Sequence, residues 1–320
     1  MRTYKITRRT AALGLAAAAL GMTAGLANAQ ELQTVRVERS PVGQFQGLFI
    51  AQEQGYFEKQ GIKLDITIGA SPDGALAQLM SGQRDVAMTG AVPLTAAVAN
   101  GMPVVAVLNA QDQNPIATFG LIVKADSSIK TIADLKGKKV GVPGIASPQG
   151  SALLKSLEQA GLTRDDVEFV NLPFPGVLQA IDAGSVDAGL PIGLFYDLAI
   201  QQGNRELKEV FNNSTLGFPA VLFAANKQWA DDNAELLQKF NAAMTEAYAY
   251  ANANHDAVRA VDIANTKMPP EYLKVRQISP FMAGFDEKAW AAENDYLLKY
   301  GFISRKPETS EYIWSKAPRQ

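Results

Sequence analysis

Residues 139–150 read KVGVPGIASPQG, and this stretch decides the predicted fold. Its first part, Lys139–Val142, is a short run with alternating valines of the kind found in buried strands. Ser147 and Pro148 follow, and these residue types are preferred at the N-cap and in the first turn of a helix. The stretch therefore predicts a strand that leads into a helix, which we expect to continue to Ala160.

The chain around this stretch extends it into a β-α-β-α-β unit. The elements expected after the helix are Val167–Asn171, a short helix ending at Gly184, and Val186–Leu190. The same order occurs about 100 residues earlier, where a glycine again ends the short helix as a left-handed C-cap. The elements expected there are Val35–Glu38, a helix through about Gln60, Ile62–Ile68, a short helix ending at Gly82, and Asp85–Met88.

This duplication predicts an α/β protein with two lobes, each a β-sheet flanked by helices. Ligands bind beyond the carboxyl ends of parallel strands, so two facing sheets would enclose one cleft. The C-terminal third is mainly helical, with an apolar stripe from Leu236 to Ala251, and we expect it to return to the first lobe. We place lobe 1 at residues 30–122 and 220–320, and lobe 2 at residues 123–219.

Composition excludes several classes of protein. The 320 residues include 30 Lys and Arg against 32 Asp and Glu, whereas a nucleic-acid partner would require a basic face. The chain has no cysteine, which excludes disulfides, thiol catalysis and cysteine metal sites. Its single histidine, His255, excludes a histidine-rich metal centre, so we expect neither metal nor cofactor.

The first 29 residues are predicted to be a signal peptide outside the fold. They contain a basic start, the uncharged run Ala11–Ala29, and the small-residue ending Ala27-Asn28-Ala29. A membrane anchor is the alternative, but the run is only weakly hydrophobic. Thr7-Arg8-Arg9 resembles a twin-arginine signal, so both Sec and Tat export stay open. We predict cleavage after Ala29 and a periplasmic location without a lipid anchor, since no cysteine is available to carry one.

Three strand-to-helix turns share the motif Ser-Pro-x-Gly: Ser40–Gly43, Ser71–Gly74 and Ser147–Gly150. Serine and proline there are good helix starts in any protein. The functional interpretation is that exposed N–H groups at helix N-termini receive an anionic or acceptor-rich ligand. Arg39 is the nearest basic residue, so these loops suit a mono-anion or an uncharged ring better than a polyanion.

Aromatic and amide side chains gather at the same strand ends, as in small-molecule pockets. Taken singly, each aromatic is better explained as a core residue. No nucleophile-elbow, Walker or zinc-protease motif occurs, and His255 is expected at a helix end, so we predict that the protein is not an enzyme. The candidate ligand-binding residues are Gln44, Phe45, Ser71, Thr89, Ser147, Gln149, Ser151, Phe174, Phe195 and Phe218.

Four segments in order carry a family resemblance. They are GLFIAQEQGYFEKQGI at 47–62, AQLMSGQRDVA at 77–87, TAAVANGMPV at 95–104 and DLKGKKVGVP at 134–143. Together they resemble the periplasmic substrate-binding proteins of ABC importers, in the branch of sulfonate, taurine, nitrate and thiamine-precursor binders. The resemblance implies a type II, Venus-flytrap fold with two lobes, and ligand contacts at Gln44, Ser71, Thr89, Ser147 and Gln149.

The resemblance also implies partners. The protein would capture a small molecule, deliver it to an inner-membrane ABC permease with its ATPase, and work as a monomer without nucleic acid. The ligand stays open among a sulfonate, an aromatic or other organic acid and a pyrimidine-like compound, since no arginine can be placed in the cleft to clamp a sulfonate. An exported ligand sensor is one alternative. A pyrimidine-synthase-like enzyme is another, although such enzymes need a reactive histidine and a cysteine-rich motif.

Overall fold

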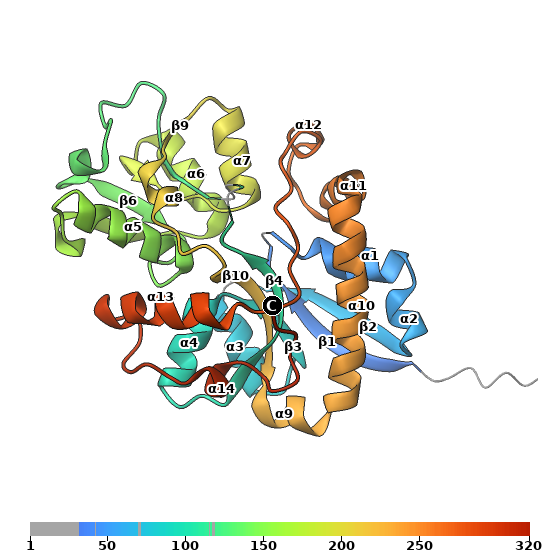
Figure 1. Ribbon diagram of the computed structural model, residues 1–320. Helices are drawn as coiled ribbons and strands as arrows, with labels where there is room; N and C mark the ends of the chain where they lie inside the picture. Colours follow the sequence, from blue (N-terminus) through green and yellow to red (C-terminus); the bar gives the residue numbers. More distant parts are fainter. Residues whose placement is uncertain (1–31, 42, 70–71, 115, 117–118) are drawn as a thin grey trace, which may run out of the picture.

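The computed structural model describes residues 32–41, 43–69, 72–114, 116 and 119–320. The predicted signal peptide and Ser71 lie outside the described residues. The chain forms two lobes, each with a five-stranded sheet and helices on its faces (Figure 1). The predicted fold class, a mixed α/β protein with two sheets flanked by helices, is therefore confirmed.

The first sheet has the strand order β2-β1-β3-β10-β4. β1 runs parallel to both β2 and β3, whereas β10 is antiparallel to β3 and β4. The elements of this part of the chain are β1 Gln33–Arg39, α1 Gln46–Glu53, α2 Tyr56–Lys59, β2 Ile62–Ile68, α3 Pro72–Met80, β3 Val86–Thr89, α4 Ala91–Ala99, β4 Val104–Asp112 and, much later, β10 Pro219–Asn226.

The second sheet repeats this arrangement in the order β7-β6-β8-β5-β9. β6 runs parallel to β7 and β8, and β5 is antiparallel to β8 and β9. Its elements are β5 Leu121–Val123, the 3-10 turn η1 Ile132–Leu135, β6 Lys139–Val142, α5 Pro148–Gln159, the 3-10 turn η2 Arg164–Asp166, β7 Glu168–Asn171, α6 Phe174–Ala183, β8 Ala188–Gly189, α7 Leu194–Gln201, β9 Arg205–Leu207 and α8 Glu209–Asn212.

Strands β2 and β6 have the predicted bounds, but the first helix differs from the prediction. It begins at Gln46, so Ser40 is not its N-cap. The reason is that Gly43 and Gln44 have φ values of 50° and 57°, in the left-handed region, and carry the chain away from a helical path. Gly55, with φ 69°, then divides the predicted helix into α1 and α2.

The C-terminal part is largely helical and packs mostly on lobe 1, while its helix at residues 270–273 also contacts α7 of lobe 2. The long helix α10 carries the predicted apolar stripe, whereas the last helix, α14, is only a single turn. The chain leaves that turn because Ile313 forms a parallel bridge with Ala106 of β4. The elements are α9 Lys227–Asp232, α10 Ala234–Ala253, α11 His255–Asn265, α12 Pro270–Leu273, α13 Glu287–Lys299 and α14 Thr309–Tyr312.

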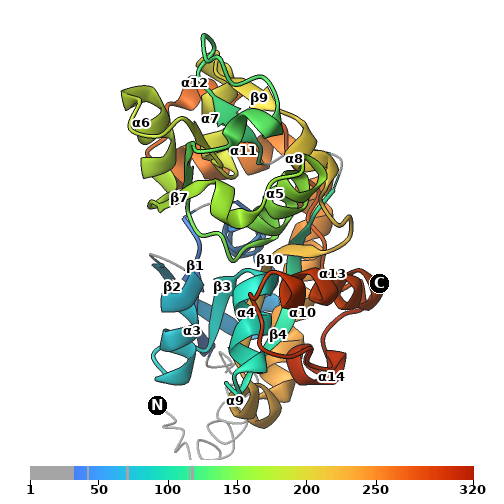
Figure 2. The ribbon, with the colours of Figure 1, turned by 90° about the vertical axis from the view of Figure 1, so that its left-hand side faces the viewer.

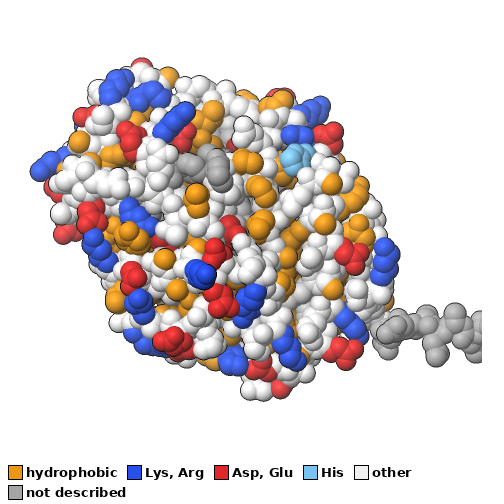
Figure 3. All heavy atoms as spheres, viewed as in Figure 1, with side chains coloured by type: hydrophobic (Ala, Val, Ile, Leu, Met, Phe, Trp, Pro, Cys, Tyr) orange, Lys and Arg blue, Asp and Glu red, His pale blue; other side chains and the backbone are white. Residues whose placement is uncertain are grey.

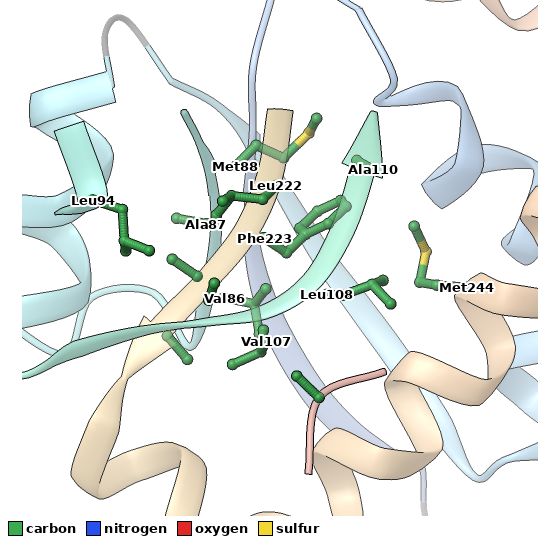
Figure 4. Close-up of a cluster of buried hydrophobic side chains, with 14 of the residues drawn as sticks. Val86, Ala87, Met88, Leu94, Val107, Leu108, Ala110, Leu222, Phe223 and Met244 are labelled. Atoms are coloured by element: carbon green, nitrogen blue, oxygen red, sulfur yellow. The ribbon is translucent and has the colours of Figure 1, made fainter. Parts of the chain in front are cut away.

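The core of lobe 1 fixes the strand ends that face lobe 2. Side chains of β3, β4 and β10 pack on both faces of the sheet, with Leu94 of α4 on one side and Met244 of α10 on the other (Figure 4). Val86, Leu108, Phe223 and Met244 have no exposed surface. Burying side chains of this size is worth roughly 1.5–3 kcal/mol each, so the scaffold around the strand ends is rigid.

The lobe boundaries differ by a few residues from those predicted. β5 pairs wholly within the second sheet, so Leu121 and Ile122 lie with lobe 2 rather than lobe 1. Phe218 belongs to the core of lobe 1 and Pro219 begins β10, so both lie with lobe 1 rather than lobe 2. The lobe limits depend on which strands pair with one another in space. The order of residues along the chain does not determine this pairing.

The surface carries charges of both signs. Lys and Arg side chains are interspersed with Asp and Glu over the face in Figure 3, without a large field of either sign. Some form exposed ion pairs, such as Arg305 with Glu311 at 2.7 Å. Among the described residues, no helix combines the length and the apolar character that a membrane span needs.

Candidate functional site

A cavity of about 680 Å³ lies at the carboxyl ends of the parallel strands of both sheets. Figure 2 shows the two lobes on either side of it, with β1 and β3 below and α5 and β7 above. The volume is in the range of small-molecule sites. The polar lining residues are Glu38, Ser40, Thr89, Asn100, Ser147, Gln149 and Asn171, and the larger apolar ones are Leu76, Met88, Pro93, Met102, Ile145, Phe174, Ile192 and Val221.

The N-terminus of α5 forms much of the lobe 2 wall. Ser147 is its N-cap, as predicted: the hydroxyl accepts from the Gly150 N–H at 3.0 Å and donates to the Gly144 carbonyl at 2.9 Å. The glycine of the motif is also required, because a Cβ on Gly150 would lie 1.8 Å from the Ile145 carbonyl oxygen. The Ser-Pro-x-Gly motif therefore folds the turn before α5 tightly back onto the helix.

A smaller pocket of about 30 Å³ adjoins the cavity, and the two share Gln149, Ile192, Ala220 and Val221. Gln44 lines this pocket in a left-handed conformation, and its amide donates to the Ser279 carbonyl at 3.3 Å. Asp197 and Arg276 face the same space. Burial raises the pKa of Asp197 to about 7, while the charge of Arg276 opposes that rise. The pocket has room for one or two water molecules.

The structure brings together five of the ten candidate ligand-binding residues. Thr89, Ser147, Gln149 and Phe174 line the main cavity, and Gln44 lines the smaller pocket beside Gln149. These residues come from both lobes, as the duplicated strand-to-helix turns predict. Their common feature is a position in, or at either end of, a connection between the carboxyl end of a strand and the helix that follows it.

Arg39 and Phe45 lie behind the cavity rather than on its wall. The Arg39 guanidinium is 4.2 Å from the centre of the Phe45 ring and 5.7 Å from that of Phe49. It donates to the Asn265 carbonyl at 3.0 Å. Burial lowers the pKa of Arg39, and only 4% of the residue is exposed. The basic residue that the sequence places nearest to the turns therefore points away from the described cavity lining.

Three further candidates also lie outside the described lining. Ser151 is buried on α5 and donates to Glu293 at 2.5 Å. Phe218 packs edge-on against Trp290, with ring centres 6.1 Å apart. Phe195 is partly exposed on α7. Ser151 lies on the side of α5 that faces α13, and Phe218 is part of the core of lobe 1.

The cavity also contains residues that the sequence did not single out. Glu38 lies in β1 and is only 2% exposed. Asn100 follows α4, and Asn171 is the last residue of β7. Asn171 could have been predicted as a cavity residue, since it is a polar residue at the carboxyl end of a predicted strand. Glu38 could not have been predicted as a cavity residue, because an acidic residue within a short strand usually faces solvent.

His255 is the first residue of α11 and is exposed, away from both cavities. Within the described ranges, no three His, Asp or Glu side chains are grouped so that they could hold a metal ion. The described lining of the main cavity consists of an apolar surface with hydroxyl, amide and carboxylate groups. Such a set binds and orients a ligand.

Two similar lobes around one interdomain cavity define the periplasmic-binding-protein fold. The chain belongs to the NMT1/THI5-like family, whose model matches residues 42–258. Among solved structures, the alkanesulfonate-binding protein SsuA from Xanthomonas axonopodis pv. citri, bound to MOPS, matches with a TM-score of 0.76. That alignment has 19% identity and covers 89% of this chain and 99% of the other, so it shows the fold alone. The resemblance found in the sequence is thereby confirmed.

Sequence relatives carry different names. A Haemophilus influenzae protein named for thiamine biosynthesis is 27% identical over 278 residues, which is 83% of this chain and 86% of that protein. The Saccharomyces cerevisiae 4-amino-5-hydroxymethyl-2-methylpyrimidine phosphate synthase THI5 is 27% identical over 226 residues, covering 67% of this chain and 64% of the synthase. The sequence relatives thus include a protein named as an enzyme, whereas the fold is shared with a binding protein.

Proposed function

We propose that the protein is the periplasmic solute-binding component of an ABC importer, which captures a small organic molecule between its lobes. The observation that carries this proposal is the cavity of about 680 Å³ lined from both lobes. A ligand that touches both walls favours the closed arrangement, because it gains contacts that the open arrangement lacks. The permease with its ATPase would then recognise the closed, loaded form.

The connections between the lobes support such a motion. The segments after β4 and before β10 cross side by side, where the Gln113 N–H donates to the Phe218 carbonyl at 2.8 Å. The Gly217 N–H donates back to the Gln113 carbonyl at 2.9 Å. Paired crossing segments of this kind allow two rigid lobes to rotate about a narrow hinge.

The ligand-binding residues that we propose are those on the cavity walls. Thr89 from lobe 1 and Ser147, Gln149 and Phe174 from lobe 2 face the ligand, and Gln44 supports it from the adjoining pocket. The apolar majority of the lining fits an organic body rather than an inorganic ion. Sulfonates, organic acids and pyrimidine-like compounds are the classes to screen.

An enzymatic function is the second candidate, because the yeast relative is named as a pyrimidine phosphate synthase. That class needs a reactive histidine, and the single histidine of this chain is exposed on α11. The chain also has no cysteine. These observations favour binding without chemistry, and a labelled ligand recovered unchanged after long incubation would support this choice.

Export and oligomeric state belong to the same proposal. We expect the protein in the periplasmic fraction, cleaved after Ala29, and monomeric by size-exclusion chromatography with light scattering. Replacing Arg8 and Arg9 by lysine distinguishes the export routes, since Tat export would stop and Sec export would continue. Retention of the uncleaved chain in the membrane would contradict the proposed location.

Native mass spectrometry of the freshly purified protein tests ligand capture, together with thermal unfolding in the presence of candidate solutes. A bound solute raises the stability by RT ln(1 + [L]/Kd), so the midpoint should rise with solute concentration. Binding of the loaded protein to a permease with its ATPase would support a role in transport. Absence of such binding would favour a sensing role. If no solute copurifies and none of the three screened classes shifts the midpoint, the receptor proposal is wrong.

A further inference from the structure

Glu38 is a buried carboxylate on the wall of the main cavity. The residue is 2% exposed, and its Oε2 has no hydrogen-bond partner among the described residues. Its Oε1 lies against Gly69, where an added Cβ would come within 1.9 Å of it. Gly69 also lines the cavity. Because Gly69 has no side chain, the Glu38 carboxylate can occupy this space.

Thr89 lies on the same face of the sheet as Glu38. In the parallel register of β1 and β3, Glu38 is opposite Ala87, and Thr89 follows two residues later, so its side chain points to the same side. The Thr89 Oγ1 is likewise buried without a hydrogen-bond partner among the described residues. Buried polar atoms are normally paired, and these two unpaired ones belong to residues that line the same cavity, which points to a ligand as their partner.

The charges around Glu38 do not neutralise it by direct contact. Arg39, next in sequence, points away toward Phe45. Arg84 lowers the pKa of Glu38 through space, but its guanidinium contacts Asp65 at 3.2 Å. A hydrogen bond from Gln78 acts in the same direction, while burial has the larger effect and raises the pKa.

Glu38 is also the only charged residue among the described lining of the main cavity. In the adjoining pocket, Arg276 is held by Asp262 at 2.6 Å. A carboxylate or sulfonate in the main cavity would therefore lack a basic partner there and would lie near the Glu38 carboxylate. A like charge at short range in a low-dielectric cavity is unfavourable, whereas a charge-assisted N–H donor is favourable.

We propose that the main cavity selects ligands that bring an N–H donor head, an amine or amidine nitrogen, to Glu38 and an apolar body to the rest of the lining. This inference rests on the proposed receptor function and narrows its ligand class. The head donates to Oε2 of Glu38 and lies within reach of the Thr89 hydroxyl. The apolar body packs against side chains such as Leu76, Met88 and Phe174.

Four probes with the same benzene ring test the inference: benzamidine, benzylamine, benzoate and benzenesulfonate. We expect the two nitrogen cations to raise the unfolding midpoint of the purified protein and the two anions to leave it unchanged. Calorimetric titration should then give a dissociation constant for benzamidine that rises about tenfold or more in Glu38→Gln, since a charge-assisted hydrogen bond is lost. Glu53→Gln, a change at an exposed residue of α1, is the matched control.

The inference is overturned if the anions stabilise the protein and the cations do not, or if Glu38→Gln binds benzamidine as tightly as the unmodified protein. It is also overturned if none of the four probes shifts the midpoint. The receptor proposal is judged separately, by native mass spectrometry and the wider solute screen. A captured acid without N–H donors would sustain the receptor proposal and refute this inference. Because glutamine has the shape of glutamate, Glu38→Gln is expected to remain folded.

Discussion

Lys155 of α5 and Glu293 of α13 form an ion pair of 2.7 Å between the lobes, with side chains 10% and 2% exposed. Ser151 donates to the same carboxylate, and so does Thr215. The Lys155 ammonium also lies 3.9 Å from the centre of the Tyr296 ring. The helix whose N-terminus lines the cavity is therefore attached, one and two turns after its N-cap, to a helix that packs on lobe 1.

Glu293→Gln should destabilise the protein by about 3–5 kcal/mol, because it leaves the Lys155 ammonium buried without a countercharge. Urea unfolding measures this difference in the free energy of unfolding. Glu235→Gln is the control: Glu235 pairs with Lys239 at 2.7 Å, but its side chain is 85% exposed. A surface pair of this kind contributes little to stability, because water screens both charges. Equal effects of the two substitutions would show that the interlobe pair is not a fixed contact.

Ser147→Ala and Gln149→Ala should separate helix capping from ligand contact. Ser147→Ala removes the N-cap of α5 and should cost about 1 kcal/mol of stability in addition to weakening binding. Gln149→Ala removes a side chain on the walls of both cavities and should lower affinity about tenfold with little change in the unfolding midpoint. Thermal unfolding without ligand and titration with the ligand captured by the protein measure the two effects. Unchanged affinity in both variants would remove the N-terminus of α5 from the proposed site.

Gly150→Ala should disturb the cavity wall more than a glycine substitution elsewhere. The new Cβ would overlap the Ile145 carbonyl oxygen, so the turn before α5 must move, at a cost of about 2 kcal/mol. Gly161→Ala is the comparison, since Gly161 has φ 75° but no heavy atom within 4 Å of an added Cβ, and about 1 kcal/mol of backbone strain is expected there. Chemical denaturation compares the two. A smaller loss for Gly150→Ala would mean that the turn adapts without strain.

Local patterns predicted the scaffold, and distant contacts decided much of the site. The strand and helix starts around Ser147 follow from residue preferences within a few positions, so they could be read from the sequence. Ser151 could not be assigned in this way, since its partner Glu293 is 142 residues away. Phe218 is an aromatic residue next to a strand end, but it packs in the core of lobe 1 against Trp290, a contact that local sequence does not indicate. Glu38 lies in the cavity because Gly69, on a neighbouring loop, leaves room for it.

Asp197→Asn should change the pH dependence of stability. Burial raises the pKa of Asp197 from 3.8 to about 7 in the folded protein, so the folded state keeps a proton that the unfolded state loses. Between about pH 4 and pH 7 unfolding therefore releases a proton, and the stability of the unmodified protein falls as pH rises. The asparagine variant lacks this loss, and its advantage should grow from near zero at pH 4 to on the order of 4 kcal/mol at pH 8.

Urea unfolding of both proteins at several pH values measures this difference. Asp112, whose pKa burial raises to about 6, adds the same slope to both proteins and cancels in the comparison. Asp126→Asn, the same substitution at an exposed position, is the matched control. A constant difference between the unmodified protein and Asp197→Asn from pH 4 to pH 8 would show that Asp197 is ionised throughout. In that case Arg276 would compensate its burial fully, and the smaller pocket beside Gln149 would contain a charged pair at every pH at which the protein works.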